Sequence, residues 1–254
     1  MNIIGIIQAR LGSTRLPGKV LLNLARKTVL EHVLERVERS KLIEDIVVAT
    51  TIKKEDLEIV KLCSNIGISV YCGAENDVLD RYYQVAKLLQ TRHIVRITAD
   101  CPMIDPEIID LTIQNYIHEN ADYSVNQNFP DGLDTEVFKF DVLKKAWKEA
   151  SLSSEREHVT AYIYNHPEMF RIINYKSEID YLEKRWTLDE PDDYEFFKII
   201  FEEVFTKNPN FGMNDVLKFL KKNPEIENLN RHIIRNEGYL KSLKEEKVLN
   251  EREE

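Results

Sequence analysis

Residues 8–19 combine three cations, two glycines and two hydroxyl side chains in one short segment. They read Gln-Ala-Arg-Leu-Gly-Ser-Thr-Arg-Leu-Pro-Gly-Lys and follow an apolar run at residues 3–7. Glycine lets backbone N–H groups approach phosphate oxygens, while arginine and lysine neutralise phosphate charge. We therefore expect residues 8–19 to bind a polyanion, with a basic surface loop as the alternative.

This segment departs from the two common glycine patterns for nucleotide binding. A Walker A loop has four residues between its glycines and a Ser or Thr after its lysine. Here five residues separate Gly12 from Gly18, and Val20 follows Lys19. No Gly-x-Gly-x-x-Gly pattern is present in the sequence. The residues alone thus predict a phosphate-binding loop of another kind.

Two aspartates stand where a metal ion could be held. Asp100 follows a strand-like run and precedes a proline by two residues, and Asp189 lies just before Pro191 at an expected helix start. Mg²⁺ is commonly bound by one or two carboxylates, with phosphate oxygens and water completing its shell. Each aspartate could instead cap the turn or helix beside it. The residues alone leave both interpretations open.

The composition limits the classes of function. The 254 residues carry a formal net charge of -9, which argues against a general nucleic-acid binder because phosphate backbones need a basic footprint. No apolar stretch approaches the roughly 18 residues of a membrane span, and the N-terminus lacks the features of a signal peptide. The three cysteines form no paired motif, so we expect a cytoplasmic protein in a reducing compartment.

Strand-like and helix-like segments alternate through the first half of the chain. Nearly continuous apolar runs are typical of strands buried on both faces, and apolar residues at helical spacing indicate helices. Four such repeats predict an α/β fold with a mostly parallel central sheet, helices on both faces, and ligands at the carboxyl ends of the strands. The expected strands are residues 3–7, 46–49, 68–71 and 94–97, and the expected helices are residues 29–37, 57–63, 78–89 and 107–116.

The second half departs from this alternation. Two strands, 123–127 and 135–140, are expected to flank the polar loop 128–134, and the chain becomes largely helical after Asp189. We expect a single domain over about residues 1–240, with an insertion at about 128–180, and a charged tail over residues 241–254. A solvated or frayed helix is the expected state of that tail. The other expected elements are helices at residues 142–150 and 155–165 and a strand at residues 170–175.

The histidines and large aromatic residues are expected to have structural roles. His158 and His166 are dispersed in the sequence and lie on an expected helix and at its end, so surface or packing roles are favoured over metal binding. The aromatic residues expected in the core are Tyr82, Tyr83, Phe196, Phe197 and Phe201.

Residues 8–10 with residues 15–19 closely resemble the fingerprint of the cytidylyltransferases that make CMP-activated sugar acids, such as CMP-Kdo and CMP-sialic acid synthetases. The resemblance covers almost the whole chain. It implies a nucleotide-diphospho-sugar transferase-like (Rossmann-like) fold, a small strand-containing insertion for dimerisation or acceptor binding, a helical C-terminus and a homodimer. The branch typified by spore-coat polysaccharide biosynthesis protein F is the more similar one, through residues 73–82, 131–137, 230–232 and 236–239.

The resemblance implies a role for each matching residue. Mg²⁺ is the implied cofactor, with Asp100 and Asp189 as the two aspartates that hold it. Arg15, Lys19 and Asp100 are the expected catalytic residues. The expected nucleotide-binding residues are Gln8, Ala9, Arg10, Gly12, Ser13, Arg15, Lys19 and Asp100.

Two positions depart from the Kdo enzymes. Thr-Ala-Asp at 98–100 replaces their Gln-Gly-Asp, and Thr-Thr at 50–51 replaces an acidic pair. In the resemblance both positions lie near base and acceptor contacts, so the resemblance does not identify the acceptor sugar. The loop 131–136 is the candidate for acceptor recognition, with an acidic turn between strands as the alternative. Its expected acceptor-binding residues are Asp131, Asp134 and Glu136.

The expected reaction is transfer of CMP from CTP to a sugar or sugar acid, with release of pyrophosphate, in surface or coat polysaccharide biosynthesis. The expected partners are CTP and this small substrate, not nucleic acid or a membrane. A glycosyltransferase that uses a nucleotide sugar is disfavoured because no Asp-x-Asp triplet exists. A non-catalytic nucleotide-binding module is disfavoured because Asp100 and Asp189 are retained together with Lys19.

Overall fold

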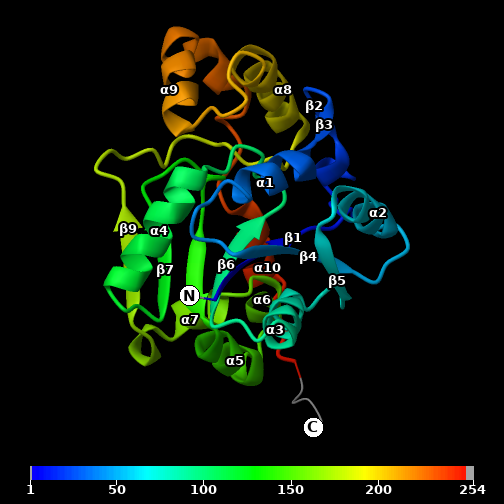
Figure 1. The fold of residues 1–254 in the computed structure, drawn as a ribbon, viewed down its shortest axis with the longest axis vertical. Coiled ribbons are helices and arrows are strands. Elements are labelled where there is room, and N and C mark those ends of the chain that lie inside the picture. The colour runs from blue at the N-terminus through cyan, green and yellow to red at the C-terminus, as the bar shows by residue number, and fades with distance from the viewer. Residues whose placement is uncertain (1, 250–254) are drawn as a thin grey trace.

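Seven strands form one sheet through the middle of the computed structural model, which describes residues 2–249 (Figure 1). These strands are β1 (Ile3–Gln8), β4 (Asp45–Thr51), β5 (Ser69–Gly73), β6 (His93–Thr98), β7 (Tyr123–Gln127), β8 (Glu136–Lys139) and β9 (Ile172–Lys176). Their order is β5-β4-β1-β6-β8-β7-β9, and only β8 is antiparallel to its neighbours. The expected α/β fold with a mostly parallel sheet is confirmed.

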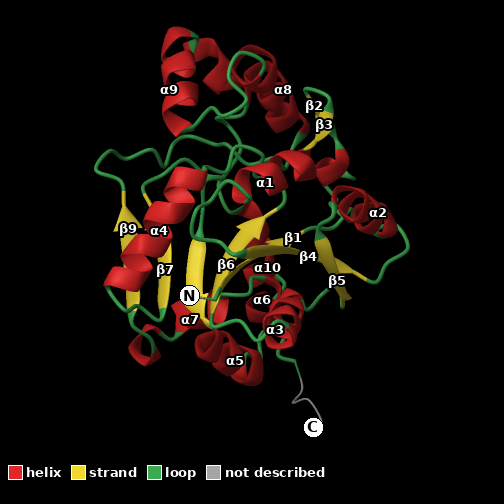
Figure 2. Cartoon of the chain, viewed as in Figure 1, coloured by secondary structure: helices red, strands yellow, loops and turns green. Residues whose placement is uncertain are grey.

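Helices cover both faces of this sheet (Figure 2). The α-helices of the described residues are α1 (Val29–Val37), α2 (Leu57–Ile66), α3 (Val78–Leu88), α4 (Pro106–His118), α5 (Phe140–Glu149), α6 (Ser153–Glu157), α7 (Ala161–Asn165), α8 (Pro191–Ile200), α9 (Met213–Lys222) and α10 (Glu237–Lys244). In β1, Ile3 and Ile7 pack with α1, α2 and α4, whereas Ile4 and Ile6 pack with α3, α5 and α7. Because both faces are buried, the strand is a nearly continuous apolar run.

A third apolar cluster lies beyond the sheet, around α8 and α9 at the top of Figure 1. Trp186 is 1% exposed in this cluster and fixes the segment that leads to Asp189. The cluster also holds Phe201 at the start of a short π-helix, Phe201–Phe205. The expected core aromatic residues are confirmed as buried: Tyr82, Tyr83, Phe196, Phe197 and Phe201.

The expected helix over residues 155–165 is wrong. α6 ends at Glu157 and α7 begins at Ala161, and Val159 between them has a φ of 58°. A right-handed helix requires negative φ, so the helix must break at this residue. The small hairpin of β2 (Asn23–Leu24) and β3 (Lys27–Thr28) was also not expected, because two-residue strands leave no periodic pattern.

The segment expected as an insertion contributes two strands to the main sheet. β8 pairs with β6 and β7, and β9 pairs in parallel with β7. Phe140 begins α5 and does not end the preceding strand. The division into residues 1–240 and a tail stays a prediction, and the tail beyond residue 249 lies outside the described residues.

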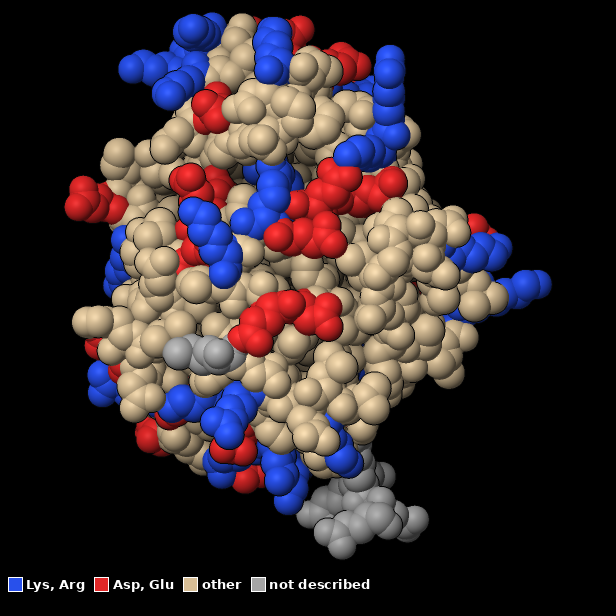
Figure 3. Space-filling view, viewed as in Figure 1, with Lys and Arg blue, Asp and Glu red and all other residues tan. Residues whose placement is uncertain are grey.

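The surface carries mixed charge. On the face shown in Figure 3, acidic side chains gather in the middle, and no continuous basic stripe crosses the described residues of that face. Within residues 2–249, no helix is both long enough and apolar enough to cross a bilayer.

Candidate active site

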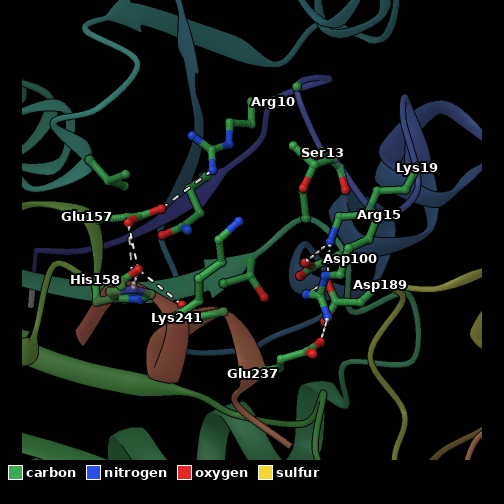
Figure 4. Close-up of a pocket in the computed structure, with 18 of the residues that line it drawn as sticks. Arg10, Ser13, Arg15, Lys19, Asp100, Glu157, His158, Asp189, Glu237 and Lys241 are labelled. Carbon is green, nitrogen blue, oxygen red and sulfur yellow. Dashed lines mark hydrogen bonds and ion pairs between the residues drawn. The ribbon is translucent and has the colours of Figure 1, made fainter. Parts of the chain in front are cut away.

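A cavity of about 810 Å³ opens where β1 and β6 end (Figure 4). This volume lies in the range typical of ligand sites. One wall is the segment after β1, and the opposite wall includes α10. All the expected nucleotide-binding and metal residues line the cavity: Gln8, Ala9, Arg10, Gly12, Ser13, Arg15, Lys19, Asp100 and Asp189.

The phosphate loop, residues 9–19, is held in shape by buried hydrogen bonds. Asp56, 1% exposed, accepts a hydrogen bond from the Leu11 backbone N–H at 2.7 Å and another from the Thr51 hydroxyl. The Gly18 N–H donates to the Leu11 carbonyl at 3.1 Å, which closes the loop on itself. Gly18 has a φ of 69°, a conformation that glycine adopts without strain, and it directs the chain into a 3-10 turn that begins at Lys19.

Lys19 joins the two aspartates that the sequence places 89 residues apart. Its Nζ lies 2.5 Å from Asp100 Oδ2 and 2.7 Å from Asp189 Oδ1. Burial alone would lower the pKa of Lys19, but the charges and hydrogen bonds of Asp100 and Asp189 raise it. Burial likewise opposes ionisation of Asp100, yet Lys19 lowers the pKa of that carboxyl to about 2. Lys19 and Asp100 therefore stabilise each other's charged forms.

The side chains of Asp100 and Asp189 contact Lys19, and neither is the N-cap of the neighbouring helix. The N-cap of α8 is Glu190, one residue after Asp189. The Asp100 side chain contacts Lys19 and the Cys101 thiol, while its backbone carbonyl accepts from the Leu188 N–H at 2.9 Å. That backbone hydrogen bond ties the two segments together, so both carboxylates reach one ammonium.

The other two cations of the phosphate loop are also paired. Arg15 Nη2 lies 3.1 Å from Asp189 Oδ1, and Arg15 Nη1 lies 2.9 Å from Glu237 Oε2 on α10. Arg10 Nη2 lies 3.6 Å from Glu157 Oε1 at the end of α6. The loop thus presents three guanidinium or ammonium groups toward the cavity, each with at least one carboxylate beside it.

Arg185 and Asp193 position Asp189, and sequence reasoning did not identify this role. Arg185 Nε and Nη2 donate to the two oxygens of Asp193 at 2.9 Å each, and Nη2 also lies 3.3 Å from Asp189 Oδ2. Asp193 is fully buried and accepts from the backbone N–H groups of Asp189 and Glu190. Its place in the first turn of α8 would by itself indicate only a favourable interaction with the helix dipole. Its burial and bidentate partner show a wider role in fixing this turn.

His158 and α10 also line the cavity, and His158 packs against α10. His158 Nε2 lies 2.9 Å from the Ser242 hydroxyl, and the Tyr239 ring packs edge-on against the imidazole. Burial lowers the pKa of His158, which favours its neutral form. Lys241 and Ser242 line the cavity, so the start of the expected solvated tail is part of its wall. Residue spacing could not reveal this, because these contacts join segments about 85 residues apart.

The expected acceptor residues lie outside the lining of the cavity. Glu136 is 7% exposed and accepts from Arg96 Nη1 at 2.7 Å and from the hydroxyls of Tyr123 and Thr160. Asp134 Oδ1 lies 3.1 Å from Arg235 Nη2. Among the described residues, neither Asp131, Asp134 nor Glu136 lines the cavity, so their acceptor role stays a prediction.

Asp131 is nevertheless linked to Asp189 through a single residue, Arg185. Its Oδ2 is 3.5 Å from Arg185 Nη1, the same guanidinium that contacts Asp189. Burial and the neighbouring Asp134 raise the pKa of Asp131 to about 7. Next to it, Gly132 has a φ of 100°, and a Cβ there would lie 2.1 Å from the Trp186 carbonyl oxygen. Only glycine allows these two segments to pack this closely.

A mostly parallel sheet, a cationic loop after its first strand and paired aspartates at the carboxyl edge fit the site expected of a nucleotidyltransferase. Residues 4–238 match the family model described as cytidylyltransferase. The chain therefore belongs to the cytidylyltransferase family.

Several proteins are similar to this chain over most of its length. It is 44% identical to an uncharacterised protein of Methanocaldococcus jannaschii over 92% of this chain and 96% of that one. It is 33% identical to the spore coat polysaccharide biosynthesis protein SpsF of Bacillus subtilis, over 88% and 96% of the two chains. The recognised resemblance to this branch is thus confirmed.

Solved structures agree with this family. A cytidylyltransferase from Leptospira borgpetersenii superposes with a TM-score of 0.85 at 36% identity, covering 89% of this chain and 97% of that one. A CMP-2-keto-3-deoxy-manno-octonic acid synthetase complexed with CTP shares the fold, with a TM-score of 0.63 at 16% identity over 80% of this chain and 99% of that one.

Proposed function

We propose that this cytidylyltransferase transfers CMP from CTP to a sugar or sugar acid with the help of Mg²⁺ and releases pyrophosphate, in the synthesis of a surface or coat polysaccharide. The observation that carries the proposal is the meeting of Lys19, Asp100 and Asp189 beside the phosphate loop. The family supports CTP as the donor, and the names of the relatives support a sugar-acid acceptor and a coat polysaccharide.

The paired aspartates fit a magnesium ion in their donor chemistry. One ammonium contacts both carboxylates, so Asp100 and Asp189 are close enough to share a single cation. Among the described residues, no group of three or more His, Cys, Asp or Glu side chains could hold a metal by itself. Mg²⁺ is usually held by few carboxylates together with substrate phosphate oxygens. A site formed jointly by the aspartates and the nucleotide is therefore the arrangement we propose.

The reaction would join the acceptor hydroxyl oxygen to the α-phosphorus of CTP. The bond from the α-phosphorus to the bridging oxygen breaks, pyrophosphate keeps that electron pair, and the hydroxyl proton passes to solvent. Bound Mg²⁺ would neutralise charge on the α-phosphate and lower the pKa of the attacking hydroxyl. Lys19 and Arg15 would hold the phosphates and stabilise the departing pyrophosphate, and such preorganised donors typically supply roughly 3–4 kcal/mol each.

The test is release of pyrophosphate from purified protein, Mg²⁺ and each of CTP, UTP, ATP and GTP, with a panel of sugar acids and neutral sugars. We expect release with CTP and a sugar acid, with formation of a CMP adduct detected by mass spectrometry. Binding of CTP no stronger than that of the purine nucleotides, measured by calorimetry, would contradict the choice of CTP. Hydrolysis or transfer from a nucleotide sugar without pyrophosphate would instead indicate a glycosyltransferase.

We also infer a homodimer, on the ground of the family resemblance. Light scattering after gel filtration should give twice the chain mass of 29.8 kDa. A single-chain mass at micromolar concentration would contradict this part of the proposal and leave the reaction untouched.

A further inference from the structure

The α10 helix turns one face toward the phosphate loop. Its lining residues recur at helical spacing, and they include Glu237, Lys241 and Lys244. α10 also contacts the end of α6, where the Ser242 hydroxyl donates to Glu157 Oε2 at 2.8 Å, and both of these residues line the cavity as well. α10 is thus docked against the body of the protein with its basic residues at the cavity.

Each cation of the phosphate loop forms an ion pair with at least one carboxylate in the free protein. Lys19 contacts Asp100 and Asp189, Arg15 contacts Asp189 and Glu237, and Arg10 contacts Glu157. A polyanion that enters the cavity must compete with these carboxylates for each loop cation. Additional cations without such partners would favour its binding.

Lys241 is a cation of this kind. Within the described residues, no carboxylate lies at ion-pair distance from Lys241 or from Lys244, one helical turn further along α10. Figure 4 shows the Lys241 side chain pointing into the cavity, from the wall that faces Arg10 and Ser13. A flexible lysine with three donors can pair with a phosphate without displacing another charge.

We propose that α10 is the second half of the triphosphate site, with Lys241 pairing with the β- and γ-phosphates while the phosphate loop holds the triphosphate from the other side. This inference rests on the proposed function for the identity of the nucleotide, but its phosphate chemistry does not depend on the base. When Arg15 turns from Glu237 to a phosphate, Lys241 supplies a new link between α10 and the loop through the ligand.

Calorimetry on Lys241→Gln tests this assignment with three probes: CTP with Mg²⁺, CMP with Mg²⁺, and inorganic tripolyphosphate. We expect about tenfold weaker binding of CTP and tripolyphosphate, the loss of one charge-assisted contact, and less than a twofold change for CMP. Lys241→Arg should retain most of the affinity. Lys222→Gln is the matched control, because Lys222 is an exposed helical lysine in the last turn of α9, outside the cavity.

Three outcomes would overturn the inference. The first is unchanged affinity for CTP and tripolyphosphate in both Lys241→Gln and the double variant Lys241→Gln/Lys244→Gln, with melting temperatures that show folded protein. The second is an equal loss for CMP, which would place Lys241 at the α-phosphate or nucleoside. The third is a wild-type protein that does not bind tripolyphosphate at millimolar concentration. A lysine-dependent tripolyphosphate site without CTP preference or pyrophosphate release would refute the proposed function and leave this inference standing.

Discussion

Arg185 and Asp193 form a buried bidentate pair, with Nε to Oδ1 and Nη2 to Oδ2 both at 2.9 Å. The same Asp193 carboxylate accepts from the backbone N–H of Asp189, and Arg185 contacts the Asp189 side chain. The position of a proposed metal ligand therefore depends on an ion pair that does not itself line the cavity.

Replacing Asp193 by Asn should destabilise the fold by about 3–5 kcal/mol, because it leaves the buried Arg185 guanidinium without its full partner. Turnover should also fall, since Asp189 loses its support. The measurement is urea unfolding followed by circular dichroism. Asp192→Asn is the matched control: Asp192 is the preceding residue of the same helix, its side chain is 56% exposed, and its change should stay within about 0.5 kcal/mol. Equal stability of the two variants would refute the role given to Asp193.

Replacing Asp100 or Asp189 by Asn should reduce turnover by about 100-fold or more, since each change removes a proposed metal ligand. Lys19 keeps one carboxylate in either variant, so we expect the free protein to remain folded. Because both ligands would serve one ion, the double variant should lose much less than the product of the two single losses. The measurement is the steady-state rate at saturating Mg²⁺ and CTP. Near-normal turnover in either single variant would contradict the proposed metal site.

Asp131 should make stability decrease from about pH 4 to pH 7. Burial and Asp134 raise its pKa to about 7 in the folded protein, against an ordinary value of about 4. The folded state therefore binds more protons than the unfolded state in this window, and stability falls as pH rises, by at most about 1.4 kcal/mol per pH unit. Asp131→Asn cannot titrate, so its stability relative to wild type should rise between pH 5 and pH 8. A constant difference in urea unfolding at the two pH values would contradict the raised pKa.

Replacing Gly132 by Ala should cost about 2 kcal/mol or more, because the new Cβ would meet the Trp186 carbonyl at 2.1 Å in a backbone conformation with positive φ. Gly67→Ala separates the two effects, since Gly67 also has positive φ but has no atom within 4 Å of the added Cβ. Thermal melting should place Gly132→Ala clearly below Gly67→Ala. Equal melting temperatures would mean that the loop moves aside freely.

The elements and the edge that carries the site could be predicted from the sequence because their signals are local. β1 is a continuous apolar run since Ile4 and Ile6 meet one helical layer while Ile3 and Ile7 meet the other. The phosphate loop follows that strand directly, and parallel strands present their carboxyl ends at one edge. Position in the chain was therefore enough to place the phosphate loop and Asp100 in one cavity.

The partners of each charge could not be predicted, because they come from distant segments. Nothing near Lys19 in the sequence indicates that it bridges two aspartates, and nothing near Arg185 indicates that Asp193 is fully buried. The break at Val159 was hidden for another reason. A valine with positive φ is disfavoured locally and is held there by the surrounding structure, so residue preferences favoured a continuous helix.

Asp56 gives the phosphate loop its shape before any ligand arrives, through the Leu11 N–H and the Thr51 hydroxyl. If the loop became ordered only on binding, the conformational entropy lost by its residues would weaken the free energy of nucleotide binding each time. Here that entropy is lost once, when the chain folds, and a folded molecule can then pass through many cycles of binding and release without losing it again. A buried carboxylate that does not line the cavity can in this way contribute to nucleotide affinity at each turnover.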